Sequence, residues 1–256
     1  MLLENKNCIL YGAGGSLGGA IARTFAREGA NLFLTGRTRA PLEAVAADIP
    51  GAQVDELDAL DGAAVDEHAR GVAARAGSVD VSFNLVSRGD VQGIPLVEMT
   101  AEDFTRPVTN GLLATFNTAA AAARIMSAGG GGAILSLTSG SSRGAHPGMG
   151  GTGPADAAME TFLRYLAAET GRQGVRVLGI YTAGVKGTLT KDGIRDVDAG
   201  GPDPDDVDRM LSGMAMLGRT PRIPDVAETA AFLASDRASG ITANIVNVTC
   251  GLFSTP

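Results

Sequence analysis

Short apolar runs alternate with longer segments of helical period along most of the chain. The short runs predict β-strands, at residues 7–11, 31–35, 52–54, 79–84, 133–137, 175–181 and 243–248. The longer segments predict helices, at residues 18–28, 41–48, 63–76, 101–126, 155–170 and 225–235, with Pro107 expected to interrupt the fourth. This alternation predicts an α/β fold of the Rossmann type, a doubly wound parallel sheet of about seven strands with helices on both faces.

The composition fits a single domain over residues 1–256, because 45% of the residues are hydrophobic and can form a sizeable core. The net charge of −7 argues against nucleic acid as a partner, since a phosphate-backbone binder normally has a basic face. No run is long enough to span a membrane and the N-terminus lacks a signal pattern, so we expect a cytoplasmic protein with no membrane partner. The two cysteines and two histidines lack metal-ligand spacing, and no metal site is expected.

Residues 186–216 differ from the rest of the chain, because they are rich in Asp, Gly and Pro. They lie between the last two strand–helix units. Two interpretations stay open for this segment: a mobile lid over a substrate pocket, or a solvated insertion at the surface.

The sequence YGAGGSLGGAIA connects the first predicted strand to the first predicted helix. Glycines at this place let the backbone turn sharply and approach a pyrophosphate, which the free N–H groups of the helix start can bind. A tight turn without a ligand is the alternative. The residues expected to contact a dinucleotide here are Gly12, Gly14, Ser16, Leu17 and Gly18.

Arg37 lies where the second predicted strand meets its loop. An acid there would bind the ribose 2′-hydroxyl of NAD, whereas an arginine suits the 2′-phosphate of NADP, so the sequence favours NADP(H) over NAD(H). The alternative is that Arg37 and Arg39 are simply surface residues. Past the third strand, Asp55 is a candidate acceptor for the adenine amino group, although a plain turn residue would look the same.

These segments resemble the classical short-chain dehydrogenase/reductase family over essentially the whole chain. The family motif T-G-x-x-x-G-x-G corresponds to residues 11–18, where Gly12 and Gly18 match while Tyr11 and Ser16 depart. Of the family motif N-N-A-G, only Asn84 is kept, and the resemblance implies that it contacts the cofactor. The family motif P-G-x-x-x-T, which packs on the nicotinamide end, corresponds to residues 183–188, so the resemblance implies cofactor contacts from Val185 and Thr188.

The resemblance also implies catalytic positions, and here the sequence departs from the family. Ser139 takes the place of the catalytic serine, and Asn110 that of the asparagine that holds a water in a proton relay. The family tyrosine exchanges a proton with the substrate oxygen, while the family lysine lowers the tyrosine pKa and binds the nicotinamide ribose. Thr152 and Asp156 occupy those two positions, and no tyrosine elsewhere supplies the Tyr-x-x-x-Lys pattern. Two substitutes for the proton donor stay open, His146 in the preceding loop and a desolvated Asp156.

Three functions follow from this pattern. The first is an NADP(H)-binding oxidoreductase that acts on a small carbonyl or alcohol with a non-standard proton donor. The second is a lyase, dehydratase or cyclase on the same scaffold that uses Asp156 or His146 as a base. The third is a catalytically inactive member that only binds a dinucleotide. Because family members often pair through the two long helices, the resemblance also implies a homotetramer or a dimer.

Overall fold

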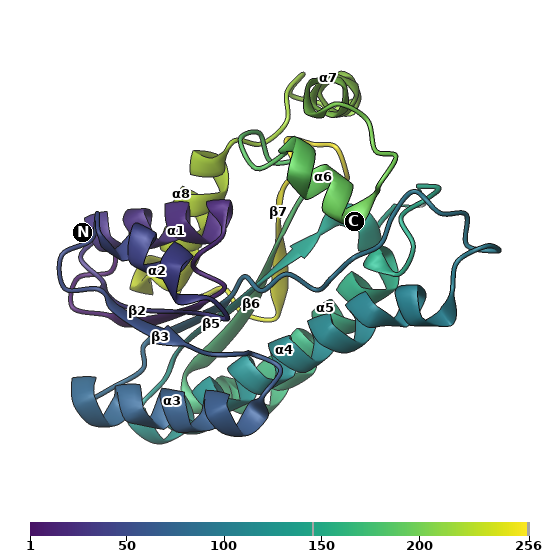
Figure 1. Ribbon diagram of the computed structural model, residues 1–256. Helices are drawn as coiled ribbons and strands as arrows, with labels where there is room; N and C mark the ends of the chain where they lie inside the picture. Colours follow the sequence, from purple (N-terminus) through teal and green to yellow (C-terminus); the bar gives the residue numbers. More distant parts are fainter. Residues whose placement is uncertain (145, 255–256) are drawn as a thin grey trace.

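The computed structural model describes residues 1–144 and 146–254, except for the side chains of residues 195–197. In these residues a parallel sheet has seven strands in the order β3-β2-β1-β4-β5-β6-β7 (Figure 1). The strands are β1 (Asn7–Tyr11), β2 (Asn31–Gly36), β3 (Gln53–Glu56), β4 (Val81–Asn84), β5 (Gly132–Ser139), β6 (Val175–Thr182) and β7 (Asn244–Val248). The order and the parallel pairing confirm the predicted Rossmann-type fold.

Helices cover both faces of the sheet (Figure 1). One layer contains α1 (Ser16–Arg27), α2 (Arg39–Ala46) and α8 (Ile223–Ala234), and the other contains α3 (Gly62–Ala76), α4 (Ala101–Gly129) and α5 (Thr152–Thr170). Side chains of β1 alternate between the two cores, with Leu10 under the first layer and Ile9 under the second. Burial on both faces explains why the strands appear as continuous apolar runs in the sequence.

The winding of the sheet reverses between β1 and β4. Strands β2 and β3 lie on one side of β1, and β4 to β7 follow on the other side. In a doubly wound sheet the loops diverge at such a reversal and leave a crevice at the carboxyl ends of the strands. The turn after β1, the loop after β4 and the end of β5 therefore lie at the same edge of the sheet.

Helix α4 corrects one expectation, because it continues through Pro107 without interruption. Proline lacks the N–H for one helical hydrogen bond, which normally weakens a helix. Pro107 is buried, however, and a Cβ on Gly151 would lie 2.9 Å from its Cγ, so the ring packs closely on the start of α5. Tertiary packing along a helix of 29 residues outweighs the one missing bond.

Residues 186–216 contain two helices that the sequence pattern did not predict, α6 (Lys191–Val197) and α7 (Pro204–Met214). The hydroxyl of Thr190 caps α6, and the carboxylate of Asp203 caps α7. Capping by such side chains compensates for the low helix propensity of Asp- and Gly-rich segments. Within the described chain, neither these helices nor the others combine the length and the apolar character that crossing a membrane requires.

Candidate functional site

The turn between β1 and α1 requires glycine at two positions. Gly12 has a φ of +83°, and a Cβ there would lie 2.8 Å from the carbonyl oxygen of Leu85. A Cβ on Gly18 would lie 2.4 Å from the carbonyl oxygen of Gly12, so the helix packs directly on the loop backbone. Helix α1 begins at Ser16, and no side chain of the described residues caps its start. Its first N–H groups and its positive dipole end are open to an anion, which fits the pyrophosphate of a dinucleotide.

The residues predicted to contact the pyrophosphate lie together. Gly12 and Gly14 line a cavity of about 270 Å³ beside the turn. Ser16, Leu17 and Gly18 form the first turn of α1 next to it. The amide of Gly12 already donates to the carbonyl oxygen of Thr35, so the N–H groups left for an anion are those at the start of α1.

The wall of this first cavity carries one cation and one carboxylate. Arg37 follows β2, and Asp58 follows β3. Arg39 pairs with Glu43 at 3.2 Å, whereas no carboxylate within the described chain pairs with Arg37. Apolar residues such as Val86 also line the cavity, so it combines apolar surface with one guanidinium that has no carboxylate partner among the described residues.

Asp55 lies elsewhere, which corrects its expected position at the adenine. Its carboxylate is 3.2 Å from His68 Nε2, so the side chain points toward α3 and away from the cavity. Side chains alternate along a strand, and Asp55 lies inside β3 rather than past its end. Asp58, three residues further on, lines the cavity instead. Burial lowers the pKa of His68, and the charge of Asp55 offsets part of that shift.

A second cavity, of about 670 Å³, lies between the end of β5, the loop after β6 and the two helices of residues 186–216. Helix α7 contributes four apolar side chains to its lining, namely Val207, Met210, Leu211 and Met214. Asp198 is the one acid among the lining residues of the described chain, and no Lys or Arg is among them. Three predicted site residues also line it, Ser139, His146 and Thr188. The cavity therefore suits an uncharged, largely apolar molecule.

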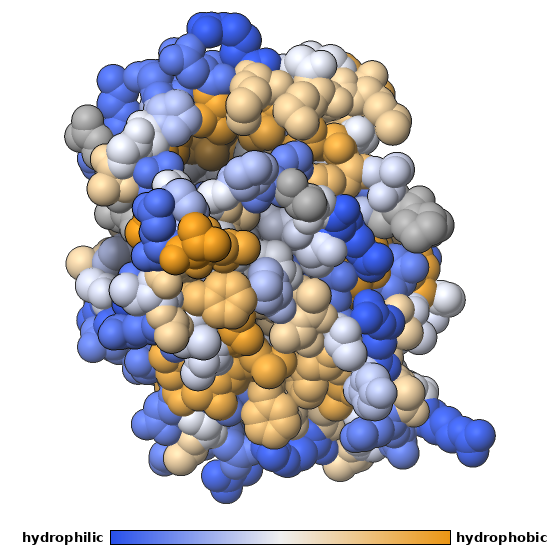
Figure 2. All heavy atoms as spheres, turned by 90° about the vertical axis from the view of Figure 1, so that its right-hand side faces the viewer, coloured by the Kyte–Doolittle hydropathy of each residue, from blue (hydrophilic) through white to orange (hydrophobic). Residues whose placement is uncertain are grey.

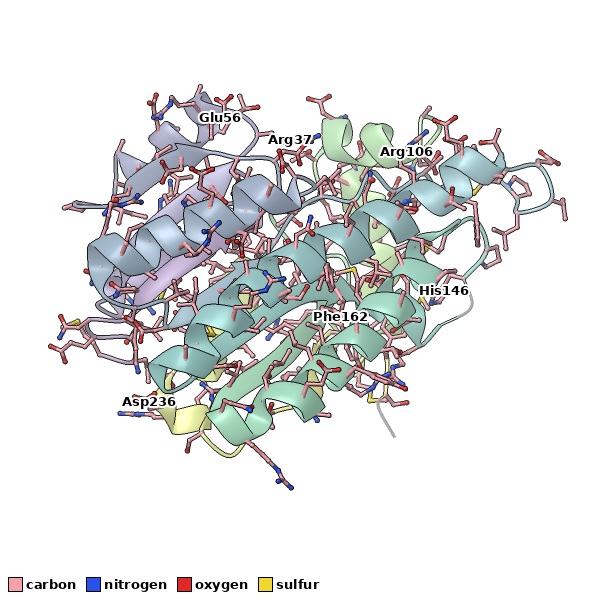
Figure 3. All side chains as sticks on the ribbon, turned by 90° about the horizontal axis from the view of Figure 1, so that it is seen from below. Arg37, Glu56, Arg106, His146, Phe162 and Asp236 are labelled. Carbon is pink, nitrogen blue, oxygen red and sulfur yellow. The ribbon has the colours of Figure 1, made fainter. Side chains whose placement is uncertain are left out.

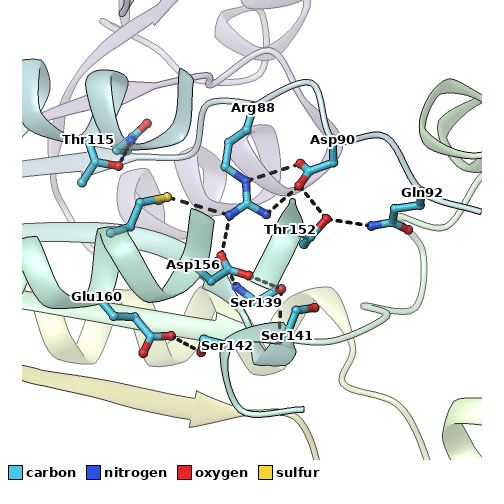
Figure 4. Close-up of polar contacts among 12 residues, drawn as sticks. Arg88, Asp90, Gln92, Thr115, Ser139, Ser141, Ser142, Thr152, Asp156 and Glu160 are labelled. Atoms are coloured by element: carbon cyan, nitrogen blue, oxygen red, sulfur yellow. Dashed lines mark hydrogen bonds and ion pairs between the residues drawn. The ribbon is translucent and has the colours of Figure 1, made fainter. Parts of the chain in front are cut away.

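A buried polar cluster connects Ser139 to the loop after β4 (Figure 4). Asp156 is fully buried, and its Oδ2 accepts a hydrogen bond from Ser139 Oγ at 2.5 Å. Its Oδ1 accepts from Arg88 Nη1 at 2.5 Å and from the amide of Ser139 at 3.1 Å. Arg88 also donates to Asp90 from Nε at 3.3 Å and from Nη2 at 3.2 Å. Figure 4 thus shows the guanidinium between two carboxylates.

The charges of this cluster act on one another. Burial raises the pKa of Asp156, while the Arg88 guanidinium and the hydrogen bonds from Ser139 offset part of the rise. Burial acts to lower the pKa of Arg88, but the carboxylates of Asp156 and Asp90 outweigh it and raise that pKa. Arg88 therefore stays charged.

Thr152 belongs to the same cluster. Its hydroxyl donates to Asp90 Oδ1 at 2.8 Å and accepts from Gln92 Nε2 at 3.3 Å. Thr152 is buried, and neither it nor Asp156 lines either cavity. The two positions that the family resemblance assigns to tyrosine and lysine are therefore joined here through Arg88 and Asp90.

Two asparagines hold the loop that carries Arg88. Asn110 donates from Nδ2 to the carbonyl oxygen of Arg88 at 3.2 Å. Asn84 donates to Thr115 Oγ1 at 2.9 Å and accepts from the amide of Val86 at 3.1 Å. Both predicted residues thus fix the backbone of the loop, and neither is among the cavity-lining residues.

His146 lies apart from the cluster. It is exposed, lines the second cavity and packs its ring edge-on against Phe253 at a centroid distance of 5.7 Å. No hydrogen bond joins it to Ser139 in the described structure. Arg37 and His146 are far apart in Figure 3, consistent with their belonging to different cavities. Val185 is buried, and its carbonyl oxygen accepts from Thr188 Oγ1 at 2.8 Å in the loop after β6.

Sequence reasoning missed several polar residues of these sites, among them Asp58, Arg88, Asp90 and Gln92. One signal could have found Arg88: it directly follows the segment that corresponds to N-N-A-G, where a charged residue comes close behind a fully buried strand. A buried charge is costly without a partner, so its presence there indicates carboxylates nearby.

Comparison with known proteins identifies the family. The profile of the family described as enoyl-(acyl carrier protein) reductase matches residues 12–253, so the chain belongs to this family of the classical short-chain dehydrogenases/reductases. Enoyl-[acyl-carrier-protein] reductase [NADH] 2 of Rhizobium meliloti is 30% identical, over 98% of this chain and 92% of that protein. L-xylulose reductase of Bos taurus is 27% identical, over 99% of this chain and 98% of that protein. The crystal structure of levodione reductase superposes with a TM-score of 0.88 at 26% identity, covering 97% of this chain and 98% of that one.

Proposed function

We propose that the protein is an NADP(H)-dependent oxidoreductase that interconverts the carbonyl and alcohol forms of an uncharged, largely apolar small molecule. The observation that carries this proposal is the position of Ser139 at the end of β5. Ser139 lines the second cavity at the same edge of the sheet as the dinucleotide turn. A substrate oxygen in that cavity would have a hydrogen-bonding hydroxyl beside the cofactor.

The residues at the first cavity support NADP(H). Arg37 has no carboxylate partner among the described residues, so its guanidinium is available for a 2′-phosphate. Asp58 takes the role first considered for Asp55, as an acceptor for the adenine amino group. A relative named as an NADH enzyme is 30% identical, which makes the choice of cofactor an experimental question. Val185 and Thr188 are proposed to contact the nicotinamide end.

When bound, the dinucleotide supplies or takes up the hydride. Ser139 holds the substrate oxygen, and Asn84 and Asn110 fix the loop beside it. Helix α7 closes the apolar side of the second cavity, which supports the interpretation of residues 186–216 as a substrate lid. The proton donor differs from the family tyrosine, because Thr152 is engaged with Asp90 and lines neither cavity.

A second function is supported by one observation. Asp156, at the position that the resemblance assigns to the family lysine, is paired with Arg88. A protein that only binds a dinucleotide would tolerate this change. Such a protein would bind NADPH and turn over no carbonyl compound.

Exposed apolar side chains on α4 and α5 support a homotetramer or dimer. Phe116 is 47% exposed and Tyr165 is 68% exposed, and the rings of Phe116 and Phe162 are 5.7 Å apart. Figure 2 shows apolar side chains gathered on this side of the molecule, and Figure 3 shows Phe162 on the outer layer of α4 and α5. Contiguous apolar patches of this kind are typical of protein interfaces.

The test combines binding with turnover. Fluorescence titration should show tighter binding of NADPH than of NADH. A screen of uncharged aliphatic and cyclic ketones with NADPH should then show consumption of the cofactor, which carboxylated and phosphorylated analogues do not produce. Binding without turnover of any ketone would favour the second function, and no binding of either dinucleotide would refute both.

A further inference from the structure

Helix α5 carries two buried carboxylates one turn apart, and both form the same kind of triad with a serine and an arginine. Asp156 contacts Ser139 and Arg88. Glu160 accepts from Ser142 Oγ at 2.6 Å and from Arg143 Nη2 at 3.3 Å. The triads differ in one respect that bears on chemistry, because Ser139 lines the second cavity and Ser142 does not.

The two triads also differ in charge. Arg88 lies between Asp90 and Asp156, so one cation faces two carboxylates in a buried place. If both were ionised, the cluster would hold a net negative charge, and burial disfavours that state. Taking up one proton removes the excess charge. Asp156 is fully buried while Asp90 is partly exposed, and burial raises the pKa of Asp156, so Asp156 is the place in this cluster where a proton would bind.

Charged groups on the surrounding helices add little to the net charge around Asp156. Glu160 on the same helix is paired with Arg143. Arg106 on α4 is paired with Asp103 at 2.9 Å and with Glu102 at 3.2 Å. Their charges are therefore largely compensated locally, and among the residues that the structure describes Arg88 is the one cation in contact with Asp156.

We propose that Ser139 is the proton donor and acceptor of the reaction and that Asp156, held by Arg88, supplies and recovers its proton. The inference rests on the proposed oxidoreductase function. Asp156 acts through Ser139 and is thus a positioning residue, while Ser139 is the catalytic residue. The Ser139 hydroxyl donates to Asp156 when that carboxyl is ionised, and it is freed toward the cavity when the carboxyl carries a proton.

The step balances in both directions. In reduction, the carbonyl carbon receives the hydride of the dihydronicotinamide, and the carbonyl oxygen receives the Ser139 proton. Ser139 Oγ then takes the proton of Asp156 Oδ2, which leaves a carboxylate beside Arg88, and one solvent proton restores it. In oxidation, the alcohol proton passes to Ser139 and on to the Asp156 carboxylate, while the hydride leaves for the oxidised nicotinamide.

The first test needs no turnover. Carbon-13 NMR of aspartate-labelled, ligand-free protein should show one carboxyl that titrates above the ordinary range and disappears in Asp156→Asn. An Asp156 carboxyl that stays ionised down to its ordinary range or below would overturn the inference. This readout is independent of whether a substrate has been found.

The second test measures kcat with NADPH across pH for the wild type, Asp156→Asn and the matched control Glu160→Gln. Asp156→Asn should keep NADPH binding, lose about 10²-fold or more in kcat and lose one limb of the pH profile, as expected for removal of a proton-transfer group. Glu160→Gln should keep both the rate and the profile. If Asp156→Asn does not fold, Ser139→Ala at the cavity wall must show the same two losses. A wild-type pH profile and rate in either variant would refute the relay, whereas NADPH binding by a wild type that reduces no ketone would refute the proposed function instead.

Discussion

The guanidinium of Arg88 contacts the carboxylate of Asp156 across 68 positions of sequence. The contact joins the loop after β4 to the first turns of α5, and Ser139 at the end of β5 completes it. Both charged groups are buried, so each depends on the other for compensation. The predictions below begin from this pair.

Removing one partner of the Arg88–Asp156 pair should lower the free energy of unfolding more than removing both partners. Arg88→Leu should lower the free energy of unfolding by about 3–5 kcal/mol, because it leaves Asp156 and Asp90 without the cation that they share. Arg88→Leu/Asp156→Leu should recover much of that loss, because only the partly exposed Asp90 then lacks a cation. Urea denaturation of the two single variants and the double variant measures the coupling. Additive losses would contradict it.

The stability of the fold should depend on pH through Asp156. Its pKa in the folded state is raised above the ordinary 3.8 by burial, so the folded protein holds the proton more tightly than the unfolded chain does. This contribution is fully present below the ordinary pKa and is lost as the pH rises through the folded-state value. The stability advantage of the wild type over Asp156→Asn should therefore shrink from about pH 4 upward. Urea denaturation at a series of pH values measures this stability difference. Ser139→Ala keeps the Asp156 carboxyl and should therefore show the same dependence of stability on pH as the wild type.

Cofactor choice should depend on Arg37. Arg37→Glu should weaken NADPH binding by about ten- to hundredfold, which corresponds to the loss of a charge-assisted hydrogen bond, and should leave NADH binding unchanged or stronger. Arg39→Gln is the matched control, since Arg39 is paired with Glu43 at the surface and does not line the cavity. Fluorescence titration of both dinucleotides provides the measurement. Equal losses for NADPH and NADH would mean that Arg37 does not contact the 2′-phosphate.

Introducing the family's tyrosine and lysine at positions 152 and 156 should not give a stable, active enzyme unless Arg88 is replaced as well. Thr152→Tyr/Asp156→Lys places an ammonium group against the Arg88 guanidinium and removes its buried carboxylate partner. We expect this double variant to melt several degrees lower than the wild type and to gain no reductase activity. Adding Arg88→Ile should restore the melting temperature. Thermal unfolding followed by an NADPH assay tests this, and a stable, active double variant would show that the site can rearrange around Arg88.

Assembly should depend on the apolar face of α4 and α5. Phe116→Ser should shift the protein toward smaller species, because it removes an exposed aromatic side chain that packs with Phe162. Leu96→Ser, at a comparably exposed residue in the loop before α4, should leave the assembly unchanged. Light scattering coupled to size-exclusion chromatography measures the mass. A wild type that is already monomeric would exclude this interface.

The fold could be predicted from the sequence because its signals are local. A buried strand appears as an apolar run. The start of α1 is marked by a glycine turn in which a larger side chain at Gly12 or Gly18 would clash with the backbone. Pro107 was misjudged because its effect depends on packing against Gly151, the residue just before α5. Helices α6 and α7 were missed because their formation depends more on the capping side chains of Thr190 and Asp203 than on their amino-acid composition.

The site could be predicted only where a position follows from a local motif. Ser139 and Arg37 fall at strand ends, and the structure places them at the cavities. The expectation for Asp55 was wrong because its side chain points from β3 toward His68. Asp58 lines the cavity instead. The role of Arg88 depends on a contact across the sheet edge that no local pattern encodes.

Residues 85–93 form a single stretch of chain that serves several parts of the site. Leu85, Val86 and Ser87 line the first cavity. Arg88, which pairs with Asp90, holds Asp156, and Gln92 and Gly93 line the second cavity. A library that varies Gln92 to change substrate preference would therefore also disturb dinucleotide affinity and proton transfer. Selection schemes for this protein should vary the α7 side of the second cavity, which has no such connection.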